Sequence, residues 1–156
     1  MHAALEPIAF LLGTWRGEGK GVYPTIPGFS YGEEIRFWEV GKPFLAYTQR
    51  TWSLAEQAPM HAESGYWRPQ PDGRLEVVLA HPTGIAEILE GTVAGPVIDV
   101  GAKTIARTTS AKDVTGLGRR FELVAPGVLR YTVFMAAGGQ PLQEHLAAEL
   151  HQVPEV

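Results

Sequence analysis

The sequence predicts an all-β fold, an antiparallel up-and-down β-barrel, and three observations lead to it. Glycines at positions 13, 17, 19 and 21 surround a single tryptophan, Trp15, in a strand-like opening segment. About ten short strand-like segments follow one another, a spacing that is typical of a sandwich or a barrel. The breaks between them are of hairpin length, which favours a meander, and closing a meander into a barrel removes its exposed edges.

Composition places the chain among folded single domains. The 156 residues predict one domain spanning 1–156. A net charge of −4 argues against nucleic acid as a partner. The absence of cysteine excludes disulfides, thiolate metal sites and cysteine nucleophiles, and it fits a cytoplasmic location. We find no signal-peptide pattern and no apolar run near 18 residues, so we expect no membrane association.

The opening segment Gly13-Thr14-Trp15-Arg16-Gly17-Glu18-Gly19 is predicted to be a strand. Each glycine would cost a helix about 1 kcal/mol relative to alanine, whereas in a strand it marks a bend or a close approach. We expect Trp15 to plug the bottom of the barrel. The preceding apolar stretch, Leu5 to Leu12, predicts one or two helical turns that close one end of the domain, with Pro7 near their start.

The remaining strands are expected between recognisable turns. The predicted ranges are 29–40, 44–54, 60–68, 74–80, 84–93, 96–100, 103–110, 116–124 and 128–137. Their breaks contain Gly41-Lys42-Pro43, Pro71-Asp72-Gly73, Gly95-Pro96, Gly101, Asp113 and Pro126-Gly127. After the last strand the period changes. Leu142, Leu146, Leu150 and Val153 recur at helical spacing, so the chain is predicted to end in a short helix that begins near Pro141.

His145 is the first candidate for chemistry. On that predicted helix it lies at the edge of the apolar face, with Glu149 one turn away on the same side as a candidate to hydrogen-bond an imidazole nitrogen. One interpretation is an ordinary boundary histidine, and the other is a neutral imidazole offered to a metal or haem iron. His151 is expected to be a solvated surface residue.

His61, Glu63 and His81 form the second candidate group. His61 and Glu63 share strand parity, and His81 precedes Pro82 at a strand end near a barrel mouth. Together they suggest a zinc site, although no HxH or HExxH motif is present, and ordinary polar residues are the alternative. Glu33 and Glu34 are expected to point to opposite faces, which excludes an acid–base pair. Arg119 and Arg120 are expected at a solvated strand edge.

Six blocks of sequence, in order, resemble the nitrobindin family. They are Gly13 to Gly19 with Tyr23-Pro24-Thr25-Ile26, Tyr31-Gly32-Glu33-Glu34, Gly41-Lys42-Pro43-Phe44, Tyr47-Thr48-Gln49-Arg50-Thr51-Trp52, Met60-His61-Ala62-Glu63-Ser64-Gly65-Tyr66, and Pro141-Leu142-Gln143-Glu144-His145-Leu146. The GxWxGxG pattern alone is shared with lipocalins and fatty-acid-binding proteins. The whole resemblance runs from about Pro7 to Val153.

This resemblance implies a ten-stranded antiparallel barrel that binds haem b at one open end, binds nitric oxide and isomerises peroxynitrite to nitrate. It implies that His145 is the axial iron ligand and that Thr25 contacts haem. His61 is assigned to the same haem-binding set, and His61 or His81 is a candidate to hydrogen-bond a ligand on the distal side. A homodimer is also implied.

Two other functions stay open at this point. One is a non-catalytic carrier of a fatty acid or another hydrophobic ligand, for which Arg50 or Arg107 would hold a carboxylate. The other is a haem-based sensor or carrier of nitric oxide that has no turnover of its own.

Overall fold

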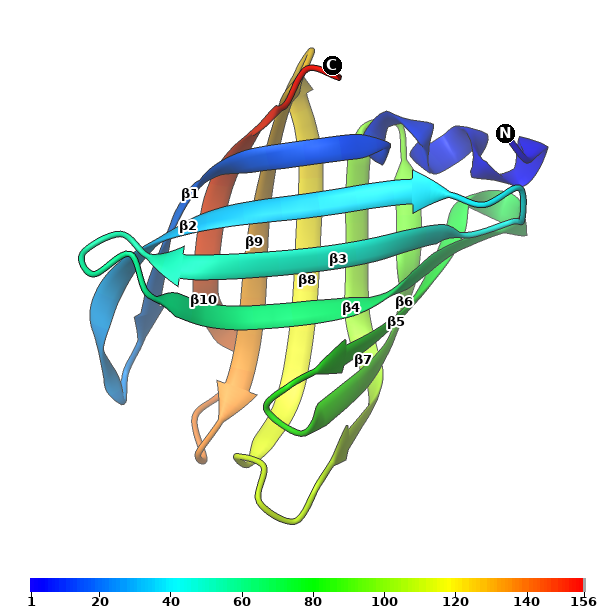
Figure 1. Cartoon of the computed structure of the whole chain (residues 1–156). Coiled ribbons are helices and arrows are strands. Elements are labelled where there is room, and N and C mark those ends of the chain that lie inside the picture. Colours follow the sequence, from blue (N-terminus) through cyan, green and yellow to red (C-terminus); the bar gives the residue numbers. More distant parts are fainter. Residues whose placement is uncertain (156) are drawn as a thin grey trace.

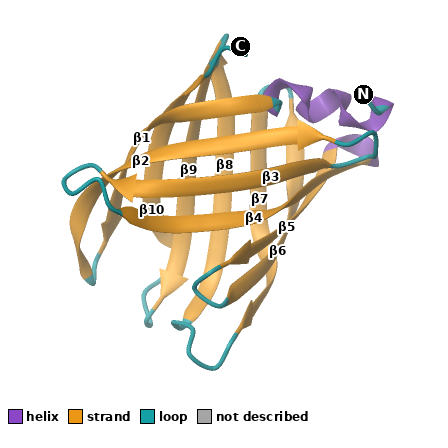
Figure 2. Cartoon of the chain, in the orientation of Figure 1, coloured by secondary structure: helices purple, strands orange, loops and turns teal. Residues whose placement is uncertain are grey.

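The computed structural model describes residues 1–155, which fold into a closed antiparallel β-barrel of ten strands. Each strand pairs with its neighbours in sequence, and β1 also pairs with β10, so the sheet has no free edge (Figure 1). Strands and short connections make up almost the whole molecule (Figure 2). The predicted fold class is therefore confirmed.

The strands differ in length but follow the predicted order. Their bounds are β1 Gly13–Tyr23, β2 Ile26–Glu39, β3 Leu45–Ser53, β4 Pro59–Gln70, β5 Arg74–His81, β6 Ile85–Ala94, β7 Val97–Arg107, β8 Val114–Ala125, β9 Val128–Ala137 and β10 Gln143–Gln152. The described residues also contain two 3₁₀ helices, η1 at Ala3–Leu11 and η2 at Pro71–Gly73. Among residues 1–155, no helix has the length and apolar character needed to cross a bilayer.

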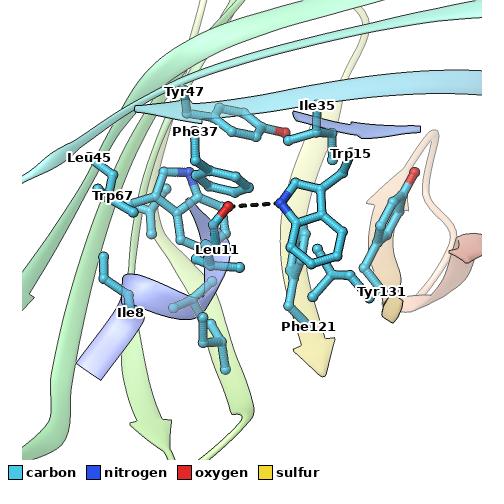
Figure 3. Close-up of a cluster of buried hydrophobic side chains, with 14 of the residues drawn as sticks. Ile8, Leu11, Trp15, Ile35, Phe37, Leu45, Tyr47, Trp67, Phe121 and Tyr131 are labelled. Atoms are coloured by element: carbon cyan, nitrogen blue, oxygen red, sulfur yellow. Dashed lines mark hydrogen bonds between the residues drawn. The ribbon is translucent and has the colours of Figure 1, made fainter. Parts of the chain in front are cut away.

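One end of the barrel is closed by η1, which lies across it beside the β2–β3 connection (Figure 1). Leu5, Ile8 and Leu11 of η1 are completely buried. The indole of Trp15 is also buried, and its Nε1 donates a hydrogen bond to the Leu11 carbonyl oxygen at 2.8 Å (Figure 3). Both the N-terminal helical segment and the Trp15 plug are confirmed.

The glycines of β1 let aromatic side chains lie directly on the strand. A Cβ at Gly19 would overlap the ring of Tyr31, and one at Gly21 would overlap the ring of Phe29. Tyr31 and Phe29 come from β2, the partner of β1 in this register. The predicted close approach is therefore made by two rings, and the ring of Phe29 lies near the open end of the barrel.

The prediction of a C-terminal helix is wrong. Residues 143–152 form β10, which pairs with β1 on one side and β9 on the other. Leu146 and Leu150 are four residues apart, a spacing that fits a strand of period two as well as a helix. Tertiary pairing decides between them, because β1 and β9 would otherwise both present open edges.

The expected number of strands was right for a partly wrong reason. Gly101 does not end a strand, because β7 runs without interruption from Val97 to Arg107. One real strand was thus split in two, while β10 was missed. Gly101 has open space where a Cβ would be, so it marks neither a turn nor a close contact.

Candidate functional site

His145 lies near the start of β10, at the end of the barrel away from η1. The pairing of β10 with β9 shifts register between Glu144 and Leu146, which makes His145 the extra residue of a β-bulge. A bulge redirects side chains relative to the regular alternation of the strand. The imidazole consequently lies against Tyr23 and Phe29 at the mouth of the barrel.

A backbone hydrogen bond selects the tautomer of His145. Its Nδ1 lies 3.0 Å from the carbonyl oxygen of Val22. A carbonyl oxygen accepts and does not donate, so Nδ1 carries the proton, and in the neutral ring Nε2 keeps a free lone pair. Histidines that bind metals are oriented in this way, with the second ring nitrogen bound to a carbonyl or carboxylate. The arrangement presents Nε2 as a ligand atom.

Two aromatic rings hold His145 in place. Tyr23 meets it edge to face at a centroid distance of 5.4 Å, and Phe29 does so at 6.4 Å. The Tyr23 hydroxyl accepts a hydrogen bond of 2.9 Å from the backbone nitrogen of Ala137, which ties β1 to β9. Thr25 lies exposed in the β1–β2 turn, two residues beyond Tyr23 and at the same end of the barrel.

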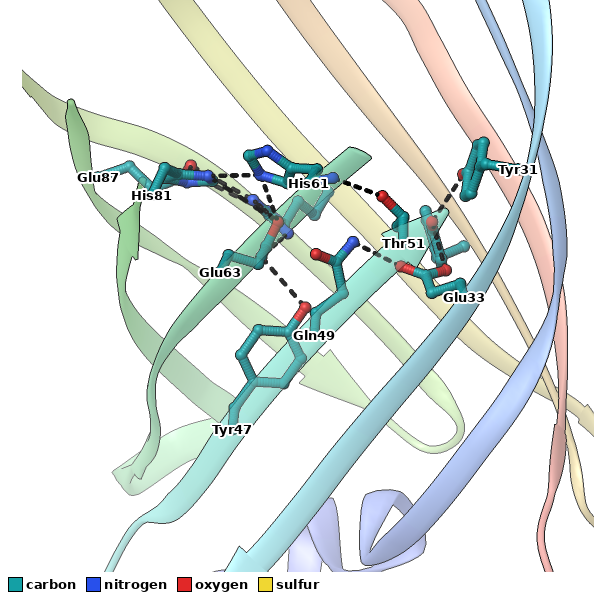
Figure 4. Close-up of polar contacts among 11 residues, drawn as sticks. Tyr31, Glu33, Tyr47, Gln49, Thr51, His61, Glu63, His81 and Glu87 are labelled. Carbon is teal, nitrogen blue, oxygen red and sulfur yellow. Dashed lines mark hydrogen bonds and ion pairs between the residues drawn. The ribbon is translucent and has the colours of Figure 1, made fainter. Parts of the chain in front are cut away.

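The second group of predicted residues lies on the opposite wall. In the cyclic strand order, β5 is five strands from β10 in either direction, and β4 is its neighbour. His61 of β4 and His81 of β5 approach to 3.1 Å between Nε2 and Nδ1 (Figure 4). The predicted shared face of His61 and Glu63 is confirmed, since Glu63 Oε1 lies 3.7 Å from His61 Nε2.

Arg119 corrects a further expectation. It is buried inside the barrel, and only its neighbour Arg120 is solvated. Its Nη1 lies 2.7 Å from Glu63 Oε2, and its Nη2 lies 3.3 Å from Glu87 Oε2. Burial opposes ionisation of both glutamates, but the Arg119 guanidinium and the contacts with His61 and His81 together outweigh it and hold the pKa of each below its usual range.

Glu33 is the opposite case in the same interior. It is fully buried, and it accepts hydrogen bonds of 2.6 Å from the Tyr131 hydroxyl and from Gln49 Nε2. Burial raises its pKa from 4.5 to about 7, because these neutral donors only partly compensate for lost hydration. Glu34 faces outward and pairs with Arg16, so the prediction that the two carboxylates point apart is confirmed.

Arg119 and Glu87 are the interior residues that the sequence reasoning missed. Strand parity contains the signal for both. Arg119 is two residues from the buried Phe121 on β8 and therefore shares its face. Glu87 is likewise two residues from the buried Leu89 on β6. A charged residue on the apolar parity of a strand indicates a buried ion pair, because an isolated buried charge is too costly.

A closed barrel with a metal-competent imidazole at its open mouth defines a cofactor-binding barrel. The chain belongs to the family of THAP4-like, heme-binding beta-barrel domains, whose model matches residues 4–152. Haem is accordingly the cofactor of this family, and a histidine oriented by a backbone carbonyl and flanked by aromatic rings is a donor that fits it.

The relatives are close and cover nearly the whole chain. Peroxynitrite isomerase 2 of Mycobacterium avium is 54% identical over 97% of this chain and 96% of its own. Peroxynitrite isomerase 1 of Mycolicibacterium paratuberculosis has the same identity and coverage. The crystal structure of Rv2717c from M. tuberculosis superposes with a TM-score of 0.91 at 46% identity, covering 99% of both chains.

Proposed function

We propose that this chain binds haem b through His145 and isomerises peroxynitrite to nitrate. The observation that carries the proposal is the hydrogen bond from His145 Nδ1 to the Val22 carbonyl, which leaves Nε2 free at the barrel mouth. Relatives named peroxynitrite isomerase, at 54% identity over 97% of the chain, support the reaction.

The residues around His145 have distinct tasks in this proposal. The carbonyl oxygen of Val22 accepts a hydrogen bond from Nδ1 of His145. This bond orients the ring and makes Nε2 a stronger ligand for iron. Tyr23 and Phe29 prevent the imidazole from rotating and give the cofactor an apolar, aromatic border. Thr25 contacts the edge of the cofactor from the β1–β2 turn. When bound, haem would supply the Lewis acidity needed for chemistry on the peroxynitrite anion.

We also assign His61 to the haem-binding residues, on the wall of the barrel that lies across from His145. It is half-buried, and its ring is within reach of solvent while that of His81 is almost covered. A ligand on the distal side of the cofactor would meet His61 first. Binding of nitric oxide is part of the proposal, because haem held by His145 would also supply an iron to which nitric oxide can bind.

Reconstitution with haem tests the assignment. His145→Ala should lose most of the Soret absorbance of the reconstituted protein, and stopped-flow decay of peroxynitrite should fall to the rate of free haem in buffer. His151→Ala is the matched control, since His151 is a solvated histidine on the same strand. An unchanged Soret band in His145→Ala would refute the ligand assignment. A normal band without accelerated decay would favour a carrier or sensor of nitric oxide.

We also propose that the chain is one domain that forms a homodimer in the cytoplasm. Tyr66, Val78 and Ile88 are exposed and directly opposite one another on β4, β5 and β6, so they form an apolar row on the outer face. A second copy would bury this row. Sedimentation equilibrium should give twice 17.0 kDa, and Val78→Glu should restore the monomer mass, whereas Val124→Glu on β8 should not.

A further inference from the structure

We propose that His61, Glu63 and His81 form a binding site for a divalent first-row transition metal ion, for which Zn²⁺ is the probe. This site does not include the proposed haem ligand His145: it lies on β4 and β5, across the barrel from β10, and shares only His61 with the proposed haem-binding residues. The three ligand atoms are His61 Nε2, His81 Nδ1 and Glu63 Oε1 (Figure 4).

The spacing of these atoms fits a metal ion. Their separations are 3.1 Å between the two histidine nitrogens, 3.7 Å from His61 to Glu63 and 4.0 Å from His81 to Glu63. The point equidistant from all three corners of such a triangle lies about 2.1 Å from each, which matches zinc bonds of about 2.0–2.2 Å to imidazole nitrogen and carboxylate oxygen. A small inward shift of the half-buried His61 would bring the three ligand atoms closer together. The ion would then lie above their plane, which opens a fourth coordination position for water.

The surrounding residues orient the ligands. His81 Nε2 lies 2.6 Å from Glu87 Oε2, so this carboxylate holds the proton on Nε2 and leaves the Nδ1 lone pair facing the site. Glu63 Oε2 is occupied by Arg119 Nη1 at 2.7 Å and by the Tyr47 hydroxyl at 3.1 Å. The other oxygen, Oε1, faces the two histidines and has a longer contact of 3.5 Å with Arg119 Nη2. A carboxylate–histidine–metal arrangement of this kind is a regular feature of zinc sites.

The charge balance of the cluster also favours a cation. Glu63 and Glu87 are both buried carboxylates, and each lies within ion-pair distance of Arg119, the one buried guanidinium between them in the part of the chain described. Two negative charges against one positive charge leave a net charge of −1 in a medium where an uncompensated charge is costly. A divalent ion at the three ligand atoms would lie directly beside Glu63 and give this buried carboxylate a second cationic partner in addition to Arg119.

Ligand type selects the class of ion. Two imidazoles and one carboxylate suit zinc, copper, iron or nickel, whereas magnesium and calcium require oxygen ligands. His61 is the solvent-facing ligand, with one third of its side chain exposed, so an ion can enter from the barrel mouth. Three protein ligands with an open fourth position is the pattern of zinc sites that hold an exchangeable water.

Calorimetric titration of ZnCl₂ into the full chain, before and after loading with haem, tests this site. We expect one zinc ion per chain in the wild type. His81→Gln and His61→Gln should each weaken binding by about a hundredfold or more, because even loss of an outer-shell partner of a ligand costs about 10–100-fold. His151→Gln is the matched control, since His151 also lies 3.2 Å from a glutamate but on the solvated outer face. Circular dichroism confirms that each variant is folded.

X-ray absorption at the zinc edge identifies the ligands in the same samples, because haem iron absorbs at a different energy. Two imidazoles and one carboxylate are expected in the wild type and also in His145→Ala, whose substitution removes the proposed haem ligand. The proposal is refuted if the wild type binds no zinc, if His81→Gln binds it as tightly as the wild type, or if the spectrum shows fewer than two imidazoles. Glu63→Gln is unsuitable as the primary variant, because it would leave Arg119 partly unpaired inside the barrel.

Discussion

The two ends of this barrel are built from the same strands but have opposite chemistry. At the closed end, η1, Trp15, Phe37 and Trp67 form a buried apolar cluster (Figure 3). Toward the open end the interior contains carboxylates, histidines and a guanidinium (Figure 4). Strand β1 shows the change within eleven residues, from the Trp15 plug to Gly21 and Tyr23 beside His145. The apolar side chains that stabilise the fold and the polar side chains available for chemistry therefore lie toward opposite ends of the barrel.

The largest expected effect is at the closed end. Trp15→Ala should lower the free energy of unfolding by about 3–5 kcal/mol, because it removes a fully buried indole and leaves a cavity under η1. Trp15→Phe keeps most of the packing and loses the hydrogen bond to Leu11, so it should cost less. Urea denaturation measures both. If the two ends are separate, the folded fraction of either variant should keep the wild-type Soret band after reconstitution.

A second prediction concerns pH and the polar interior. The pKa of Glu33 is raised from 4.5 to about 7, so this group favours the folded state below pH 4.5, and that contribution is lost as the pH rises toward 7. The shift corresponds to about 3 kcal/mol. Glu33→Gln should therefore be as stable as the wild type at pH 4 and more stable at pH 8. Denaturation midpoints at the two pH values measure the difference.

The neighbours of Glu33 make this substitution well matched. Gln49 Oε1 is buried and has no hydrogen-bond partner among the described residues. If the Gln49 amide flips, it can accept a bond from the new glutamine, while the Tyr131 hydroxyl can still donate to the glutamine carbonyl. If the stability of the variant and of the wild type depends on pH in the same way, folding does not raise the pKa of Glu33, and this carboxylate is ionised in the folded protein at neutral pH.

The closed end was largely predictable from sequence, and the reason is local. A glycine-flanked tryptophan after a short apolar segment needs no distant partner to be interpreted as a strand and a plug. The interior charges were less accessible. The fate of Arg119 depends on two glutamates from β4 and β6, which are brought to it only by closure of the sheet. Parity predicts which face Arg119 occupies but not which residues compensate its charge.

The start of β10 shows a different limit. The family resemblance singled out His145, but the helix expected around it was wrong, and so was the partner expected from that helix. Glu149 pairs with Arg130 at 3.0 Å on the outer face of the barrel. The true partner of His145 is a backbone carbonyl 123 positions away, which side-chain patterns cannot reveal. A bulge is equally invisible in the sequence, because it is a property of the pairing between two strands.

The smallest expected effect tests the link between the opening motif and the open end. Gly21 has no Cβ because the Phe29 ring occupies that space, and Phe29 in turn packs against His145. Gly21→Ala should push this ring toward the imidazole and weaken haem binding by about tenfold, or about 1.4 kcal/mol. Gly101→Ala is the matched control, because Gly101 also lies within a strand and its Cβ would meet open space. Haem titration measures both. If the two variants bind haem equally well, the glycines of β1 serve only to let the strands pack, and the motif that opens the chain makes no contribution to its cofactor site.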